Sequence, residues 1–130
     1  MNSLVLAYLF RNTGSKNERF VFSPSVDLSF PGEGERYLRV LSLGEGDKEA
    51  VTIGDFSPLR NIKGLEFRDL ENEAVLSLES SRSFNGRVFH VRSGFPGLEE
   101  YQSTCVMPLL PVSLEENKTW KVSFSLKINS

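Results

Sequence analysis

The chain has 130 residues, which suits a single domain with its own hydrophobic core, so residues 1–130 are taken as one β domain. The formal net charge is −2, with 17 acidic residues scattered among 15 basic ones, so no overall field favours nucleic acid or an anionic membrane as a partner. Phenylalanine is frequent, at 10 residues, and aromatic-rich sequences favour strands.

The N-terminal segment predicts a strand. Residues 4–10 are apolar, but no basic residue precedes them and Arg11 closes the run, so no signal peptide is predicted. No stretch approaches the ~18 apolar residues needed to cross a bilayer. Cys105 is the single cysteine, which excludes an internal disulfide and suits a reducing compartment. The expected location is the cytoplasm or an assembled particle, without a membrane.

Alternation of apolar and polar residues predicts further strands. Between residues 20 and 30, five apolar residues fall on even positions: Phe20, Phe22, Val26, Leu28 and Phe30. Pro24 cannot donate to a ladder and makes this an edge strand or two pieces. The C-terminal segment alternates in the same way from Trp120 to Ile128. The full set of predicted strands covers residues 3–11, 19–30 in one or two pieces, 36–43, 50–54, 65–70, 74–84, 87–93, 103–114 and 118–128.

Asn85-Gly86 predicts a two-residue type I′ hairpin loop between two of these strands. This register would pair Phe84 with Arg87. It would also leave His90 on an exposed polar face of the hairpin.

Helix signals are few. Ser57 followed by Pro58 is typical of an N-cap and a first helical position, and Gly64 would end that helix after about a turn and a half. Residues 96–101 predict a second short turn. Short strands at intervals of roughly 8–12 residues indicate a single antiparallel β-sandwich, jelly-roll-like or a small barrel, with one or two short helical turns.

Catalytic and metal-binding candidates are sparse. His90 is the only histidine, so a Ser-His-Asp or Cys-His centre must include it, and on an open sheet it would have neither pocket nor oxyanion hole. No catalytic residue and no cofactor is predicted, apart from calcium. Asp69, Glu71 and Glu73 alternate next to a predicted turn and offer oxygen ligands, although a solvated acidic turn accounts for them as well.

Phe95 and Tyr101 are the candidate ligand-binding residues. Phe95 lies between two glycines in a predicted loop, where an exposed aromatic side chain would indicate a binding surface. Insertion of Phe95 into the core is the alternative, and it is the one that we expect.

An apolar run bracketed by Pro108 and Pro111 should interrupt any regular ladder. A strand bend inside the core explains the run, and the alternative is a sheet edge that pairs with a neighbouring subunit. The candidate interface residues are Val106, Leu109, Leu110 and, from the C-terminal strand, Trp120.

These observations favour a non-enzymatic structural or assembly protein, such as a shell, capsid-decoration or tail component of a virus-like particle or virion. It would act through β-edge and terminal-strand contacts with protein partners, as a homo-oligomer or a larger assembly. The first alternative is a carbohydrate- or ligand-binding β-sandwich module. The second is an enzyme with a carboxylate-based site, which leaves no local sequence signature.

Overall fold

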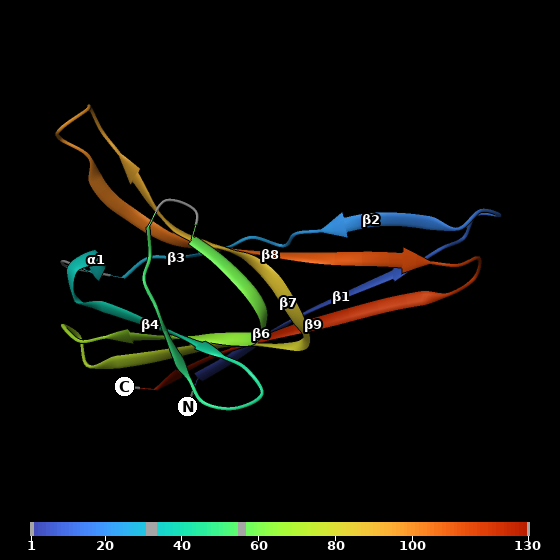
Figure 1. The fold of residues 1–130 in the computed structure, drawn as a ribbon, viewed down its shortest axis with the longest axis horizontal. Coiled ribbons are helices and arrows are strands. Elements are labelled where there is room, and N and C mark those ends of the chain that lie inside the picture. The colour runs from blue at the N-terminus through green and yellow to red at the C-terminus, as the bar shows by residue number, and fades with distance from the viewer. Residues whose placement is uncertain (1, 31–33, 55–56, 130) are drawn as a thin grey trace.

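The computed structural model describes residues 2–30, 34–54 and 57–129, which form an almost entirely antiparallel β structure (Figure 1). Within this part of the chain, helix is limited to the four residues of α1. The predicted all-β, sandwich-like fold is therefore confirmed. The elements in chain order are β1 (Asn2–Arg11), β2 (Glu18–Phe22), β3 (Val26–Leu28), α1 (Gly34–Tyr37), β4 (Leu38–Leu43), β5 (Glu49–Val51), β6 (Ser57–Asp69), β7 (Ala74–Ser93), β8 (Glu100–Leu114) and β9 (Thr119–Asn129).

Strand β7 connects the two parts of the sheet. Residues 75–80 pair with β9, residues 85–93 pair with β8, and β6 lies along the other side of both parts. The strand path is β1-β9-β7-β6-β4-β5, while β8 adds β2 and β3 beyond β7. As a result β2 and β8 run alongside β1 and β9 as a long two-layered arm, at the right of Figure 1.

Aromatic side chains hold the two layers of this arm together. Tyr8 and Phe10 on β1 meet Phe22 on β2 edge to face, with ring centroids 4.9 and 4.8 Å apart. Phe10 also contacts Phe20 at 5.3 Å and Trp120 at 5.9 Å. Aromatic pairs of this geometry add about 0.5–1.5 kcal/mol beyond the burial of their area. The high phenylalanine content thus has a structural use.

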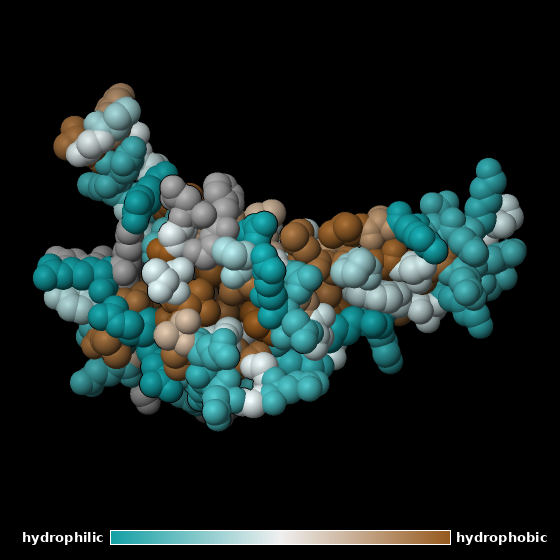
Figure 2. Space-filling view, viewed as in Figure 1, coloured by the Kyte–Doolittle hydropathy of each residue, from teal (hydrophilic) through white to brown (hydrophobic). Residues whose placement is uncertain are grey.

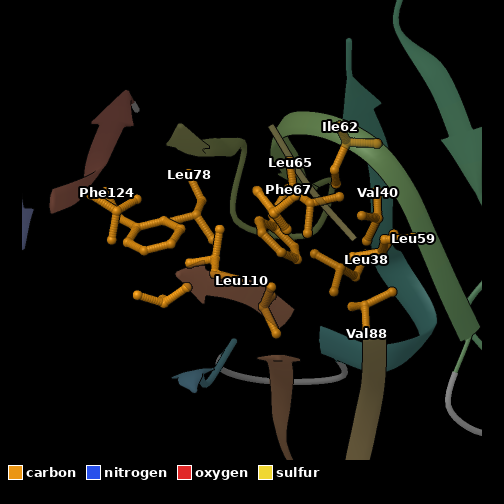
Figure 3. Packing of buried hydrophobic residues seen from close by; sticks show 14 of the residues in the cluster. Leu38, Val40, Leu59, Ile62, Leu65, Phe67, Leu78, Val88, Leu110 and Phe124 are labelled. Atoms are coloured by element: carbon orange, nitrogen blue, oxygen red, sulfur yellow. The ribbon is translucent and has the colours of Figure 1, made fainter. Parts of the chain in front are cut away.

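The central core lies where β4, β6, β7 and β8 meet (Figure 3). Leu65, Phe67, Leu78, Val88 and Val106 are 0% exposed. Successive side chains of a strand point to opposite faces, so Leu65 and Phe67, two residues apart on β6, both point into the core. Each fully buried side chain of this size contributes about 1.5–3 kcal/mol.

The predicted hairpin at Asn85-Gly86 is wrong, because both residues lie inside the unbroken strand β7. Gly86 pairs with Pro108, and a Cβ atom there would lie 2.3 Å from the carbonyl oxygen of Met107. Close approach of two backbones, and not a turn, requires this glycine. The Asn85 side chain accepts a hydrogen bond from the backbone N–H of Asn61 at 2.8 Å. The hairpin turn lies at residues 70–73 instead.

Two further predictions about local structure need correction. The helix predicted to begin at Ser57 and Pro58 is the start of β6, and the short helix α1 precedes β4 instead. The prolines of β8 do not interrupt that strand. They flank the point where pairing of β8 with β7 ends and pairing with β2 begins. The pairing with β7 extends to Leu109, and the pairing with β2 starts at Leu110. None of the helical residues that the structure describes forms a segment able to span a membrane.

Candidate functional site

An open groove of about 510 Å³ lies beside β4 and β5. The polar residues that line it include Arg39 from β4, Arg68 from β6 and His90 from β7. Small-molecule sites have this form, with apolar walls and a few placed polar groups. The other described lining residues are Leu38, Val40, Leu41, Ala50, Val51, Thr52, Ile53 and Leu70.

His90 is fixed by a hydrogen-bond network on β8. Its Nδ1 lies 2.9 Å from Oγ1 of Thr104, which is 0% exposed, and the Tyr101 hydroxyl lies 2.8 Å from the same Oγ1. The rings of His90 and Tyr101 meet edge to face at 5.4 Å. The exposed position predicted for His90 is therefore wrong: the side chain is half-buried, because it pairs with β8 and not across a hairpin.

This network determines what the imidazole can do. Burial lowers the pKa of His90 below its usual 6.5, so the ring is neutral at neutral pH. If Thr104 donates to Nδ1, the other ring nitrogen carries the proton and can donate it. If Tyr101 donates to the carbonyl oxygen of Leu28, 3.5 Å away, Thr104 can accept from Nδ1–H and Nε2 becomes an acceptor. Either arrangement presents a nitrogen that can exchange a proton.

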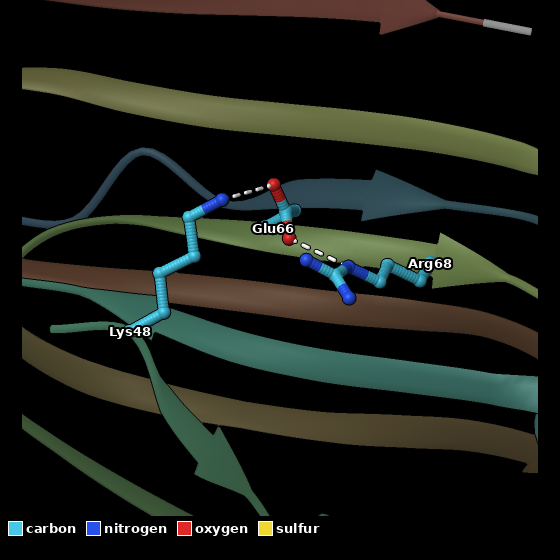
Figure 4. A network of polar contacts seen from close by, with 3 residues as sticks. All are labelled: Lys48, Glu66 and Arg68. Atoms are coloured by element: carbon cyan, nitrogen blue, oxygen red, sulfur yellow. Dashed lines mark hydrogen bonds and ion pairs between the residues drawn. The ribbon is translucent and has the colours of Figure 1, made fainter.

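A buried carboxylate orients one of the two groove arginines (Figure 4). Glu66 is 8% exposed, and its Oε1 accepts from Nζ of Lys48 at 2.9 Å while Oε2 accepts from Nε of Arg68 at 2.8 Å. The hydrogen bond from Lys48 is the main reason why the pKa of Glu66 is lowered, with Arg68 adding to it against the effect of burial. Glu66 therefore stays ionised and holds the Arg68 side chain in place.

The predicted calcium ligands form a turn. The carboxylate of Asp69, which is 3% exposed, accepts from the backbone N–H groups of Glu71 and Asn72 at 3.2 and 3.1 Å, and from the Asn72 side chain at 2.7 Å. Glu73 closes the turn with a φ of 51°. Across the residues that the structure describes, no group of three or more His, Cys, Asp or Glu side chains is placed to hold a metal ion.

The structure places Phe95 and Tyr101 apart. Phe95 is 78% exposed in the loop between β7 and β8, where Leu98 is 74% exposed, so the expected insertion of Phe95 into the core is wrong. Figure 2 shows that this hairpin projects from the body of the molecule. Tyr101 lies nearer the body, with its hydroxyl at Thr104. Tyr101 thus helps to position His90 through Thr104, whereas Phe95 belongs to a separate exposed surface.

The candidate interface residues lie mostly within the chain itself. Val106, Leu110 and Trp120 are at most 9% exposed and belong to the hydrophobic core, and Leu109 is half-buried. In this fold their side chains stabilise the chain and do not form an exposed edge. The expected homo-oligomer stays a prediction.

Two solved structures have a similar fold. One is a protein from Escherichia coli K12 provisionally named an aldose 1-epimerase, with a TM-score of 0.70 and 10% identity over 98% of this chain and 56% of that one. The other is HI1317, with a TM-score of 0.53 and 7% identity over 96% of this chain and 51% of that one. The chain thus spans about half the length of either protein. It matches no protein-family profile and no curated protein.

These likenesses correct the sequence-based interpretation of function. The expectation of a non-enzymatic structural or assembly protein, and of a viral shell, capsid-decoration or tail component, is contradicted, because the neighbour with the higher TM-score is named for an enzyme of sugar chemistry. The name of that protein agrees with the alternative of a carbohydrate-binding β-sandwich, which stays a proposal.

Sequence reasoning missed the groove. Arg39, Arg68 and His90 are far apart in the sequence and line one groove only through the pairing of β4 with β6 and the course of β7. The one signal available was that Arg39 alternates with the apolar Leu38 and Val40, which marks it as outward-facing.

Proposed function

We propose that this chain is a carbohydrate-binding β-sandwich domain that binds an aldose in the groove beside His90. The observation that carries the proposal is an imidazole tied by Nδ1 to a buried threonine on the wall of a groove of about 510 Å³. The name of the E. coli protein of similar fold supports an aldose as the ligand.

The lining of the groove matches the surface of a pyranose ring. A sugar presents C–H groups on its faces and hydroxyl groups around its rim. Apolar side chains such as Val51 and Ile53 can pack against a face, while Arg39, Arg68 and His90 can bond the hydroxyl groups. His90 is neutral, so it can donate to one hydroxyl or accept from it.

The test is a titration of the chain with glucose and with galactose, in which ¹⁵N–¹H NMR spectra record the chemical shifts. Sorbitol is the open-chain control. His90→Phe keeps a ring beside Tyr101 but removes both nitrogens, and it should abolish saturable shifts. Phe95→Ala is the matched control on the projecting hairpin and should bind as the wild type does. No saturable shift with either aldose, or binding lost with Phe95→Ala and kept with His90→Phe, would overturn the proposal.

Aldose 1-epimerisation is a second candidate function, favoured by the neutral, oriented imidazole of His90. In this reaction the O1 proton of a cyclic aldose is removed, the C1–O5 bond breaks and O5 takes up a proton. The open aldehyde then closes on its other face, with the two proton transfers reversed. His90 can serve one of these transfers.

We favour sugar binding over catalysis as the function because epimerisation needs a second proton-transferring group. Among the described residues that line the groove, the ionisable ones are His90 and two arginines, and arginine does not lose its proton. Polarimetry of freshly dissolved α-glucose tests this function. A rate above the buffer rate that disappears in His90→Phe supports it, and an unchanged rate in the wild type excludes it for this chain.

A further inference from the structure

We propose that two copies of this chain pair through strand β1 and form a dimer with two-fold symmetry. None of the described residues that line the groove belongs to β1, so the dimer does not depend on sugar binding. The proposal follows from the edge that β1 presents to solvent.

Strand β1 is an open edge of the sheet. Among the strands that the structure describes, it pairs with β9 alone, so its other side offers a row of backbone N–H and C=O groups to a further strand. The strand has ten residues, whereas the other edge strands β2, β3 and β5 have five, three and three. Each of those short strands carries charge, which protects an edge, while the one charged residue of β1 is Arg11 at its end.

The side chains of β1 leave apolar surface uncovered on both faces. Tyr8 and Phe10 point into the arm, so the odd-numbered residues, which alternate with them, point outward. Two of these outward residues, Val5 and Leu9, are 60% and 68% exposed. Leu4 lies on the inner face with Tyr8 and Phe10, yet it is 55% exposed. A further strand beside β1 would cover all three exposed side chains.

A second copy is the partner because the sequence of β1 is complementary to itself. Antiparallel pairing must match outward residues with outward ones, and a two-fold axis at Ala7 does so. Val5 of each copy then lies opposite Leu9 of the other, and Ser3 lies opposite Arg11. No like charges meet in this register, and the apolar stripe of one copy continues in that of the other.

The same register covers the exposed residues of the inner face. Leu4 of one copy lies opposite Phe10 of the other, and Leu6 lies opposite Tyr8. The axis is perpendicular to the joined sheet, so the second layers of both arms lie on the same side of it. Phe20, which belongs to that layer, is 39% exposed and contacts Phe10 at 5.3 Å, so the dimer brings it toward Leu4 of the other copy.

Sedimentation equilibrium of the whole chain tests the dimer. An interface of one strand pair lies below the roughly 1,200 Å² of standard complexes, so association should appear between about 10 μM and 1 mM. Ala7→Asp places two carboxylates opposite each other at the axis and should raise the dimer dissociation constant at least about ten-fold. Val21→Lys, at a 63% exposed position on the edge strand β2, is the matched control and should leave it unchanged.

Oxidative cross-linking tests the register. Ala7→Cys brings two thiols together at the axis and should form a disulfide-linked dimer rapidly. Ser3→Cys, at an exposed position on the same strand, places its thiol opposite Arg11 and should cross-link at least about ten-fold more slowly. The native Cys105 is buried and does not compete.

Three results would overturn the proposal. The first is a wild-type chain that stays monomeric up to 1 mM, as marked by the upper limit of about 1 mM above. The second is a dimer that persists in Ala7→Asp or is lost in Val21→Lys. The third is equal cross-linking of Ala7→Cys and Ser3→Cys, which indicates random collision. Circular dichroism of every variant excludes loss of fold as the cause.

Discussion

His90 and Thr104 face each other across the ladder of β7 and β8, and Nδ1 of the imidazole lies 2.9 Å from Oγ1 of the threonine. Thr104 is 0% exposed, so the partner that orients this groove residue belongs to the core. Two adjacent strands, and not a mobile loop, therefore determine the position of the imidazole, which suits a binding site that is formed before its ligand arrives.

Replacing Thr104 by valine should destabilise the fold and loosen the groove. The change keeps the shape of the side chain but removes the hydroxyl that both His90 and Tyr101 contact. Leaving two part-buried polar groups without this partner costs about 1–3 kcal/mol, which urea unfolding can measure. Ser113→Ala, at an exposed position on the same strand, should change stability by less than about 0.5 kcal/mol. Equal effects of the two changes would argue against the network.

Stability should fall in mildly acidic solution because of His90. Its folded pKa lies below 6.5, so the unfolded chain takes up the proton more readily than the folded chain does. The stabilising contribution of the neutral ring is full above about pH 6.5 and is lost as pH falls through the folded pKa. The urea midpoint should drop across this window in the wild type and stay flatter in His90→Phe.

The ionised Glu66 makes the stability of the fold depend on pH in a lower range. Its pKa is lowered from 4.5, so its contribution is present above that value and is lost as pH falls through the folded pKa. A pH dependence between about 5 and 6.5 that persists in His90→Phe would show that His90 is not its source.

Gly86→Ala and Gly64→Ala should each be strongly destabilising. A Cβ atom at Gly86 would lie 2.3 Å from the carbonyl oxygen of Met107, and one at Gly64 would lie 2.1 Å from that of Leu78. Since both obstacles are backbone atoms of paired strands, relief requires the strands to separate, at a cost of about 3 kcal/mol. Gly44→Ala is the control, because its Cβ atom would meet nothing within 4 Å. A mild effect at Gly86 would contradict the close approach of β7 to β8.

Cys105 should be unreactive in the folded chain. Burial, followed by the hydrogen bond and charge of Asp27, raises its pKa to about 11. Because the thiolate is the reactive form, iodoacetamide at about pH 8 should modify the native protein very slowly and the urea-unfolded protein quickly. Mass spectrometry follows the modification. Equal rates in the two states would show that the thiol is accessible and that its pKa is not raised.

The C-terminal strand was predictable from the sequence because its alternation is regular, and the N-terminal strand was predictable because its residues form an apolar run. Strand β9 follows the predicted period of two from Trp120, and Pro24 separates β2 from β3, as expected of a residue that cannot donate to a ladder. In β9 one face is mainly aromatic or aliphatic and the other is mainly polar, so the local pattern and the packed structure agree.

The centre of the molecule was not predictable from local patterns. Asn85-Gly86 is a strong turn signal, yet tertiary packing uses Gly86 for contact between backbones and extends β7 through it. The error moved His90 to a wrong face and concealed its pairing with Thr104. Likewise Arg39 and Arg68 become neighbours only through the register of β4 and β6, which no local pattern contains.

The most direct test of the groove uses the fact that the chain has a single histidine and a single tryptophan. The imidazole Hε1 signal in a proton NMR spectrum therefore reports on His90 alone, and the indole N–H signal reports on Trp120 in the core of the arm. Titration with an aldose should shift the His90 signal saturably and leave the Trp120 signal in place. A His90 signal that stays unchanged at saturating sugar would contradict the proposal that this groove binds carbohydrate.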